Sequence, residues 1–296
     1  MSTKTKKSSH LLGILYILTA AFGFSMMTFL VKESGDLPTM QKVFFRNIVA
    51  TVIAAVTLLR TPEKFKVKKG SWGDLFTRSI FGYLGMLANF WAIDKLVLAD
   101  SNILNKMSPF FAIIMSYFIL KEKPNLVEKL TVVIAFIGAV FVIQPTSGVA
   151  SLPAVVGLIS GFCAGTAYTF VRKLGNKGER GPLIVFFFSA FTSLASLPFL
   201  FANHVHMSAF QWACLLGSGA AAAVGQFAIT AAYTHAPAKE ISVFDYSQVI
   251  FAAILGFLFF GEVPNWLSFV GYAVIIGTAV FRWYYNLHRE EKKENE

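Results

Sequence analysis

The feature that most constrains this chain is a series of ten long apolar segments joined by short polar connections. A helix needs roughly 20 mainly apolar residues to cross the hydrocarbon core of a bilayer, and each segment has about that length. The sequence is 55% hydrophobic and only 14% charged, which excludes an ordinary soluble domain. The predicted spans are 11–31, 41–59, 74–93, 98–120, 127–144, 153–171, 182–202, 209–232, 238–260 and 265–285.

The net charge of +10 indicates membrane topology and not nucleic-acid binding. Most of the 26 Lys and Arg residues fall in the termini and in the connections that would share their side of the membrane. The other side holds only Lys32, Lys42 and Lys95. Lys and Arg accumulate on the cytoplasmic side of membrane proteins. We therefore predict a multi-pass protein of the cell membrane with cytoplasmic N and C termini, which contacts the lipid bilayer and no nucleic acid.

The two halves of the sequence resemble each other. Placing Glu122 over Glu262 aligns "ADSNILNKMSPFFAIIMSYFILKEKP" with "KEISVFDYSQVIFAAILGFLFFGEVP", and "TFLVK" matches "TFVRK" in nearly the same register. A unit with an odd number of spans must insert its second copy upside down. We therefore predict an all-α membrane protein whose ten transmembrane helices form two inverted five-helix repeats, residues 1–148 and 149–296.

Three sequence features together carry a family resemblance: the two five-span halves, the segment "FFRNIVATVIAAVTLL", and the paired endings "YFILKEKP" and "FLFFGEVP". On these the chain resembles the ten-helix, EamA-type branch of the drug/metabolite transporter superfamily over nearly its whole length. The resemblance implies the fold and transport, and it leaves the substrate open because members carry very different small metabolites. One departure is that Arg46 meets Ser189 or a neighbour in the second half, so the halves have diverged in polarity.

Two polar stripes occupy equivalent spans of the two halves. Ionisable groups in mid-bilayer cost at least about 2.5–3.5 kcal/mol on insertion scales, so they usually face a bundle interior or a wet cavity. Residues three or four apart share one face of a helix. Because the repeat relates the stripes, we expect them to face each other and to bind the substrate. Their members are Asn102, Asn105 and Lys106 in the first half, and Asp245, Tyr246 and Gln248 in the second.

The depth of the charged residues predicts how charge is distributed in such a cavity. At a rise of 1.5 Å per residue, Arg46 and Lys106 would lie about 8 and 12 Å from the outer surface, and Asp245 about 10 Å from the inner surface. Two cations would then occupy the outer half and one carboxylate the inner half. The alternatives are a structural Lys106–Asp245 ion pair and snorkelling of Arg46. Arg78 is expected to snorkel to the cytoplasmic surface.

Further polar and aromatic residues are candidates for the same cavity, with interhelical hydrogen bonding or packing as the alternative. They are Asn89, Gln226, Tyr83, Trp91 and Tyr168. The aligned Glu122 and Glu262 would lie at opposite faces, as gates or as helix caps. Pro109 is expected to kink its span. A row of glycines at 157, 161 and 165 allows close helix packing, inside the bundle or between two copies.

These observations predict a secondary active transporter that moves a small polar metabolite, anionic or zwitterionic by preference, by alternating access. The sequence contains no nucleotide-binding motif, so coupling would be to protons, Na+ or exchange. The alternative is an exporter of amphipathic cationic compounds with Asp245 as substrate or proton site. A membrane-embedded transferase is disfavoured because none of the five His has a companion at catalytic spacing. We expect no enzymatic activity, cofactor or metal, and a monomer or homodimer.

Overall fold

The computed structural model describes residues 3–144, 151–235 and 242–294, and within these residues every regular element is a helix. The first half contains α1 (Thr3–Glu33), α2 (Thr39–Leu59), α3 (Trp72–Ile93), α4 (Leu98–Asn105), α5 (Ser108–Ile119) and α6 (Leu126–Ile143). The second half contains α7 (Leu152–Asn176), α8 (Gly181–Ala202), α9 (Ala209–His235), the 3-10 helix η1 (Ser242–Tyr246), α11 (Ser247–Phe260) and α12 (Trp266–Glu294). The predicted all-α architecture is confirmed.

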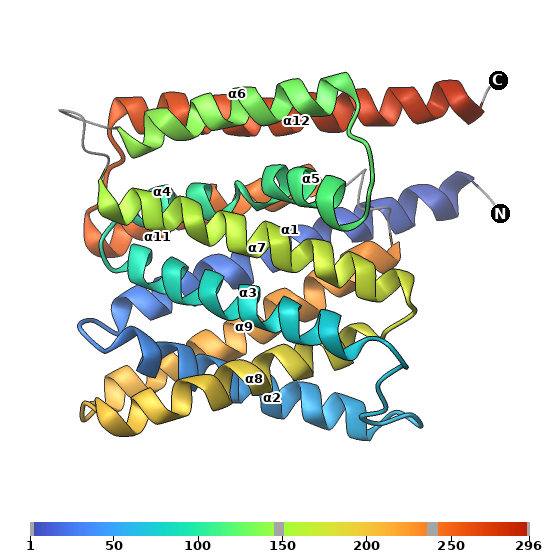
Figure 1. The fold of residues 1–296 in the computed structure, drawn as a ribbon. Coiled ribbons are helices and arrows are strands. Elements are labelled where there is room, and N and C mark those ends of the chain that lie inside the picture. Colours follow the sequence, from blue (N-terminus) through green and yellow to red (C-terminus); the bar gives the residue numbers. More distant parts are fainter. Residues whose placement is uncertain (1–2, 145–150, 236–241, 295–296) are drawn as a thin grey trace.

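Eight segments of the described chain are long and apolar enough to cross a membrane. The 22-residue α3 runs alongside them, and α4 and α5 together cover one more crossing (Figure 1). Each predicted span therefore corresponds to one helix or to one interrupted pair. The start of the predicted span 238–260 and the predicted repeat boundary at 148/149 lie outside the described residues.

The second set of five spans is inverted relative to the first. In Figure 1, α1 starts from the side of the bundle where both termini lie, whereas α7 starts from the opposite side. The connections 60–71, 120–125 and 177–180 share the side of the termini, and they carry many of the basic residues. This is the inverted-repeat arrangement that the odd number of spans per unit predicted.

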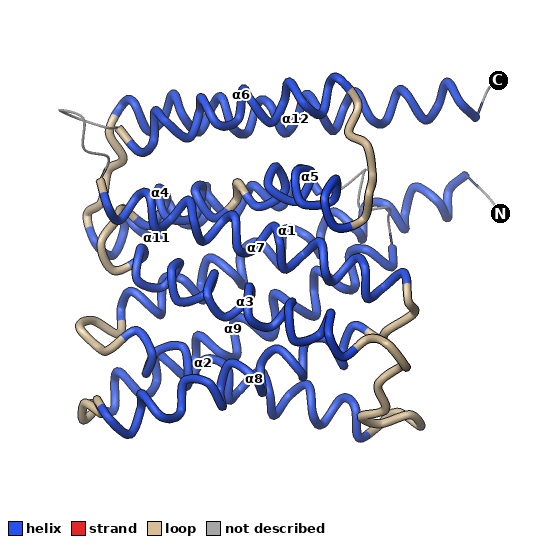
Figure 2. Tube along the Cα trace, in the orientation of Figure 1, coloured by secondary structure: helices blue, strands red, loops and turns tan. Residues whose placement is uncertain are grey.

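One crossing in each half departs from a continuous α-helix, and the two departures fall at equivalent positions: a turn between α4 and α5, and the change from η1 to α11. α4 ends with Lys106 as its C-cap, and α11 begins after Tyr246, the residue that aligns with Lys106. Figure 2 shows the interruption between α4 and α5 as a short loop. Pro109 lies in the first turn of α5, where its missing N–H leaves no hydrogen bond unmade. In place of the expected kink, a two-residue turn at Lys106 and Met107 separates α4 from α5.

The glycine row of α7 packs against this turn. A Cβ added at Gly161 would lie 2.6 Å from the carbonyl oxygen of Leu104, and one at Gly165 would lie 2.5 Å from that of Ser108. Only glycine permits so close an approach to another backbone. The row therefore serves packing inside the bundle, and it fixes the ends of α4 and α5 beside α7.

Candidate functional site

The two predicted polar stripes do face each other. Lys106, at the end of α4, forms an ion pair with Asp245 of η1, and the two side chains are only 11% and 21% exposed. The Tyr246 hydroxyl donates a hydrogen bond of 3.2 Å to the carbonyl oxygen of Lys106. The predicted separation of cation and carboxylate into different halves of the cavity is wrong. Backbone rise alone was counted, whereas the long Lys106 side chain bridges the remaining depth.

A buried amide pair continues this network toward α1. Gln248 Nε2 donates to Asn102 Oδ1 at 2.6 Å, and Asn102 Nδ2 donates to the Leu98 carbonyl at 2.8 Å. Ser25 of α1 donates to the Gln248 carbonyl at 2.8 Å, and Thr28 lies 3.4 Å from Asn102 Nδ2. The amides of α4 and α11 are therefore satisfied within the protein, and they tie both interrupted crossings to α1.

Two polar groups mark the edge of the network. Asn105 is half-buried, and its Nδ2 donates to Ser160 Oγ of α7 at 3.1 Å. Asp245 Oδ1 is buried and has no hydrogen-bond partner among the described residues. The carboxylate thus uses one oxygen for Lys106 and keeps the other oxygen available for a proton or a ligand.

A second charged network lies at the end of the bundle away from the termini. Glu262 forms an ion pair with Lys32, with side chains 16% and 15% exposed, and its other oxygen accepts the N–H of Leu98 at 2.8 Å. Leu98 is the first residue of α4, so Glu262 also caps that helix. Lys32 further donates to the Leu96 carbonyl at 2.6 Å. Both predicted roles, gate and cap, are compatible with this geometry.

Further contacts reinforce the same end. Lys42 is fully buried and pairs with Asp94 at 2.6 Å, and the Tyr272 hydroxyl donates to Asp100 at 2.5 Å. Burial raises the pKa of the Asp94 carboxyl, and the Lys42 charge acts in the opposite direction. Sequence analysis treated Lys32 and Lys42 as loop charges and missed this network. The available signal was that acidic residues lie in connections on the same predicted membrane face as Lys32 and Lys42.

The opposite end carries more exposed ion pairs. Glu122 contacts Arg172 at 2.9 Å, with side chains 42% and 60% exposed. Asp74, at the start of α3, is paired with Lys173 at 2.8 Å and with Lys177 at 2.6 Å. Solvent screens such pairs when they are exposed. The two aligned glutamates therefore lie at opposite ends, as predicted, but in different degrees of burial.

Arg78 does not snorkel, and that prediction is wrong. Its guanidinium stacks over the Phe188 ring of α8 at 3.9 Å, and it contacts the position of Gly82, one turn further into the bundle. Its Nε and Nη1 are buried, and neither has a hydrogen-bond partner among the described residues. Gly82 leaves room for the side chain and Phe188 offers an aromatic face to the cation, so the charge points inward.

Arg46 of α2 also keeps its charge inside the bundle. Its Nη1 donates to the buried Asn47 Oδ1 at 2.8 Å, and its Nε is buried without a partner among the described residues. The adjacent Asn47 contacts the Met86 sulfur of α3, the helix that carries Arg78, at 3.0 Å. Both arginines thus hold charge inside the bundle, although the sequence placed Arg46 toward the outer end of its span and Arg78 toward the cytoplasmic end of its own.

A row of hydroxyl groups on α8 has no hydrogen-bond partner in the described chain. Its four members are at most 5% exposed, and their spacing places them on one stripe of the helix. α8 packs against α2 and α3, the helices that carry the two arginines (Figure 1). Sequence analysis singled out only the first of these residues, although the spacing of all four was readable. The members are Ser189, Thr192, Ser193 and Ser196.

The remaining predicted residues are distributed over three helices. Asn89 Oδ1 is buried without a partner among the described residues, and Asn89 lies on the same stripe of α3 as Arg78. The Tyr83 hydroxyl contacts the Met40 sulfur at 3.2 Å. Trp91 is half-buried on α3, Gln226 is exposed on α9, and Tyr168 is exposed on α7.

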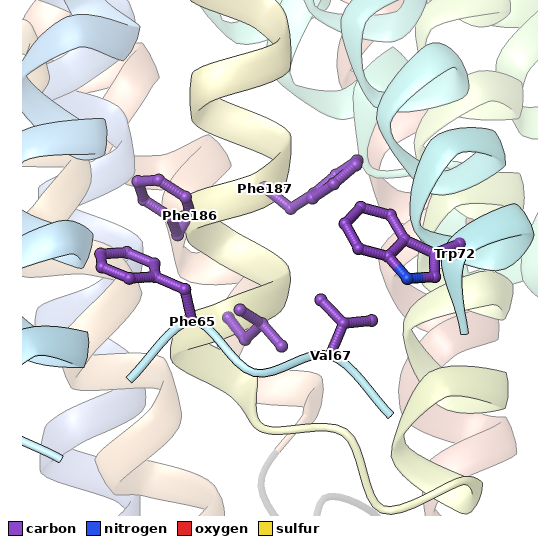
Figure 3. A pocket seen from close by; sticks show the side chains of 6 residues that line it. Phe65, Val67, Trp72, Phe186 and Phe187 are labelled. Carbon is purple, nitrogen blue, oxygen red and sulfur yellow. The ribbon is translucent and has the colours of Figure 1, made fainter. Parts of the chain in front are cut away.

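A pocket of about 290 Å³ lies near the first turns of α3 and α8 (Figure 3). Five of its six lining side chains have no hydrogen-bonding group, so it suits apolar groups and offers little to a polar solute. It is separate from the buried charges described above. Its lining residues are Phe65, Val67, Trp72, Leu183, Phe186 and Phe187.

Inverted repeats whose interrupted helices meet at buried polar groups are characteristic of membrane transporters. Comparison with known proteins agrees with this class. The sequence pattern of the EamA-like transporter family matches residues 11–144 and again residues 151–283. The chain belongs to the EamA-like transporter family and contains the family unit twice.

Individual relatives cover almost the whole chain. The pseudopaline exporter of Pseudomonas aeruginosa (strain UCBPP-PA14) is 34% identical over 89% of this chain and 93% of its own length. The riboflavin transporter of Vibrio cholerae is 24% identical over 98% of both chains, and human solute carrier family 35 member G1 is 25% identical over 92% and 80%. A crystal structure at 14% identity matches 94% of this chain and 98% of that chain with a TM-score of 0.61, which supports the fold alone.

Proposed function

We propose that this protein is a secondary active transporter that moves a small polar metabolite by alternating access at a site between its repeats. The repeats, residues 1–148 and 149–296, would be the moving bodies. The observation that carries the proposal is that one crossing in each repeat departs from a continuous α-helix at equivalent positions, where Lys106 of one repeat meets Asp245 of the other. Ends of half-helices leave unpaired backbone groups that a solute can bind.

The central ion pair is the proposed point of solute contact. In the absence of solute, Lys106 and Asp245 neutralise each other. A carboxylate on the solute would compete for Lys106, and an ammonium group would compete for Asp245. Arg46 adds positive charge, which favours an anionic or zwitterionic solute. Asn102, Asn105, Tyr246 and Gln248 would orient the solute, and Asn89, Gln226, Tyr83, Trp91 and Tyr168 would line its route.

The two aligned glutamates are the proposed gates. Glu262 closes one end through its buried contact with Lys32 and with the start of α4, while the Glu122–Arg172 pair at the other end is exposed. Rocking of the repeats would break the first contact and bury the second. The basic connections on the side of the termini support a cytoplasmic location for the Glu122 end and a cell-membrane location for the protein.

Export is the direction we propose, since one 34% identical relative is an exporter. Protons or Na+ would drive the cycle, and Asp245 is the proposed proton carrier because its Oδ1 has no partner among the described residues. The same free oxygen favours one second candidate, an exporter of amphipathic cationic compounds that bind at Asp245. The family of the chain favours transport over an enzymatic reaction.

A thermal-stability screen in detergent tests the site and its charge preference. Wild type, Lys106→Met and the exposed control Lys129→Met are measured against small anions, zwitterions and cations, because a ligand that binds the folded state raises the unfolding temperature. We expect an anionic or zwitterionic hit that Lys106→Met loses and Lys129→Met keeps. Stabilisation by cations alone would support the second candidate.

Transport itself is tested by reconstituting wild type and Lys106→Met into liposomes. The hits are supplied under an imposed proton or Na+ gradient, and solute movement is followed over time. We expect gradient-driven movement by wild type that the variant loses. The proposed function is contradicted if wild type binds a hit but does not move it under any imposed gradient and does not exchange it.

A further inference from the structure

We infer that Arg46, Arg78 and the hydroxyl row of α8 form a binding site for solutes that carry two negative charges on oxyanion groups. The hydroxyl row consists of Ser189, Thr192, Ser193 and Ser196. This inference deepens the proposed function and rests on it for transport, while binding at the site can be measured independently. It assigns the selection of substrate charge to these residues and not to the central ion pair.

Arg78 carries a charge with no counter-charge among the described residues. Two of its three guanidinium nitrogens are buried and have no hydrogen-bond partner there, and the guanidinium lies over the Phe188 ring. Asp74, one turn earlier on α3, is already shared by Lys173 and Lys177. An unpaired charge inside a membrane bundle is costly and usually marks a functional site. A bound anion would supply the missing charge.

Arg46 doubles the positive charge at this place. The adjacent Asn47 contacts the Met86 sulfur of α3, the helix of Arg78, at 3.0 Å, and the hydrogen bond of Arg46 to the neutral Asn47 amide provides no counter-charge. Two like charges in a low-dielectric interior repel each other, which adds to the cost of leaving them uncompensated. A ligand with two negative charges would therefore balance the two arginines, whereas a ligand with one negative charge would leave one positive charge uncompensated.

The hydroxyl row completes a set of groups suited to oxyanions. A Ser or Thr hydroxyl can donate one hydrogen bond and accept others, and leaving it buried without a partner costs free energy. Four such hydroxyls lie on one stripe of α8, which packs against the helices of both arginines. Guanidinium groups bind carboxylate and phosphate through paired N–H donors. The site fits dicarboxylates and phosphates, two ligand types with the same chemistry.

The central pair does not compete for this role. Lys106 and Asp245 neutralise each other, so that pair does not select for net solute charge. The arginines carry two charges that no described acidic residue balances. We therefore expect doubly charged oxyanions to bind better than single anions, and cations to be excluded.

The first experiment needs no ligand. Arg78→Met keeps an apolar contact with Phe188, and Arg282→Met is a matched control because Arg282 also lies over a phenylalanine ring, that of Phe110, at 5.5 Å. In buffer free of multivalent anions, we expect Arg78→Met to unfold at the same temperature as wild type or higher, because an uncompensated buried charge has been removed. A clear fall in unfolding temperature would make Arg78 a structural residue and overturn the inference.

The second experiment measures anion binding by thermal stabilisation at constant ionic strength, with succinate and inorganic phosphate as dianions and acetate as the single anion. We expect wild type to bind a dianion more tightly than acetate, and Arg78→Met to bind it at least about 10-fold more weakly, as the loss of charged hydrogen bonds implies. Arg78→Lys, which keeps the charge and loses the paired donors, should fall between them. Arg282→Met should match wild type.

The outcomes separate this inference from the proposed function. Equal binding of dianions and acetate by wild type, or unchanged dianion binding in Arg78→Met, overturns the inference. A preference for succinate over phosphate identifies carboxylates as the ligands, and the reverse identifies phosphates. Dianion binding that depends on Arg78 without any movement into liposomes supports the site and contradicts the transporter. Transport of a dianion that is unaffected in Arg78→Met contradicts the inference and leaves the transporter intact.

Discussion

The Lys106–Asp245 ion pair can be tested by a double-mutant cycle. The single variants Lys106→Met and Asp245→Asn each leave the other charge without its partner, while the double variant removes both charges. The side chains are only 11% and 21% exposed, so the remaining charge in each single variant stays largely buried. The double variant should therefore be more stable than the sum of the two single effects predicts.

The expected magnitudes follow from this burial. Breaking a fully buried pair costs about 3–5 kcal/mol, and the residual exposure of both side chains reduces this to about 2–3 kcal/mol for each single variant. The double variant should lose about 1 kcal/mol, since both charges are gone, which gives a coupling free energy of about 3–5 kcal/mol. At roughly 2–4 °C per kcal/mol, each single variant should unfold about 4–12 °C below wild type.

Thermal unfolding in one detergent, at one scan rate and one pH, measures all four proteins in the cycle. Far-UV circular dichroism checks that each variant is helical before heating. The reasoning is refuted if the double variant loses as much stability as the two single variants combined, because the charges would then contribute independently. It is also refuted if both single variants unfold within 1–2 °C of wild type, a shift of roughly 0.5 kcal/mol.

Two further predictions concern packing and the ends of the bundle. Gly165→Ala should lower the free energy of unfolding by about 2 kcal/mol or more, since its Cβ would lie 2.5 Å from a backbone oxygen of α5. Gly175→Ala on the same helix, with nothing within 4 Å, should leave stability unchanged or raise it by about 0.5 kcal/mol, and thermal unfolding compares the two. Glu262→Gln should cost about 1–3 kcal/mol because the Lys32 pair is largely buried. Glu122→Gln, in an exposed pair, should change stability by less than about 0.5 kcal/mol, and equal losses in the two variants would contradict the proposed difference between the ends.

The sequence was sufficient to predict the arrangement of the helices. The length of the apolar segments predicted the membrane crossings. The alignment of Glu122 with Glu262 predicted the repeat, and the odd number of spans in each unit predicted its inversion. Pro109 indicated a disturbance of its span, but the sequence did not show that α7 approaches the turn between α4 and α5 closely at Gly161 and Gly165. That approach is a tertiary contact, which the periodicity within one segment does not report.

The candidate site was predictable in part. Helical spacing and the repeat predicted that Lys106 and Asp245 face each other, and the contacts between the two stripes confirm it. The sequence did not predict that the Arg78 side chain points into the bundle, because the position of a residue in the sequence indicates only the depth of its Cα. The direction is set by the room at Gly82 and by the ring of Phe188, which α8 brings from a distant part of the chain.

Ion pairs join the two repeats at three places. At the end away from the termini, in the centre and at the end where the termini lie, an ion pair joins a residue of the first half to a residue of the second. These pairs are Lys32–Glu262, Lys106–Asp245 and Glu122–Arg172. The two end pairs are equivalent under the repeat, because Glu122 aligns with Glu262 and Arg172 adjoins the residue that aligns with Lys32, so neither end pair needs divergence in charge. The central pair does need it, because Lys106 aligns with Tyr246 and Asp245 with Asn105. Because the pairs cross the interface at three depths, rocking about the centre would separate one end pair while bringing the other together. The burial of the Lys32–Glu262 pair and the exposure of the Glu122–Arg172 pair agree with one extreme of that motion.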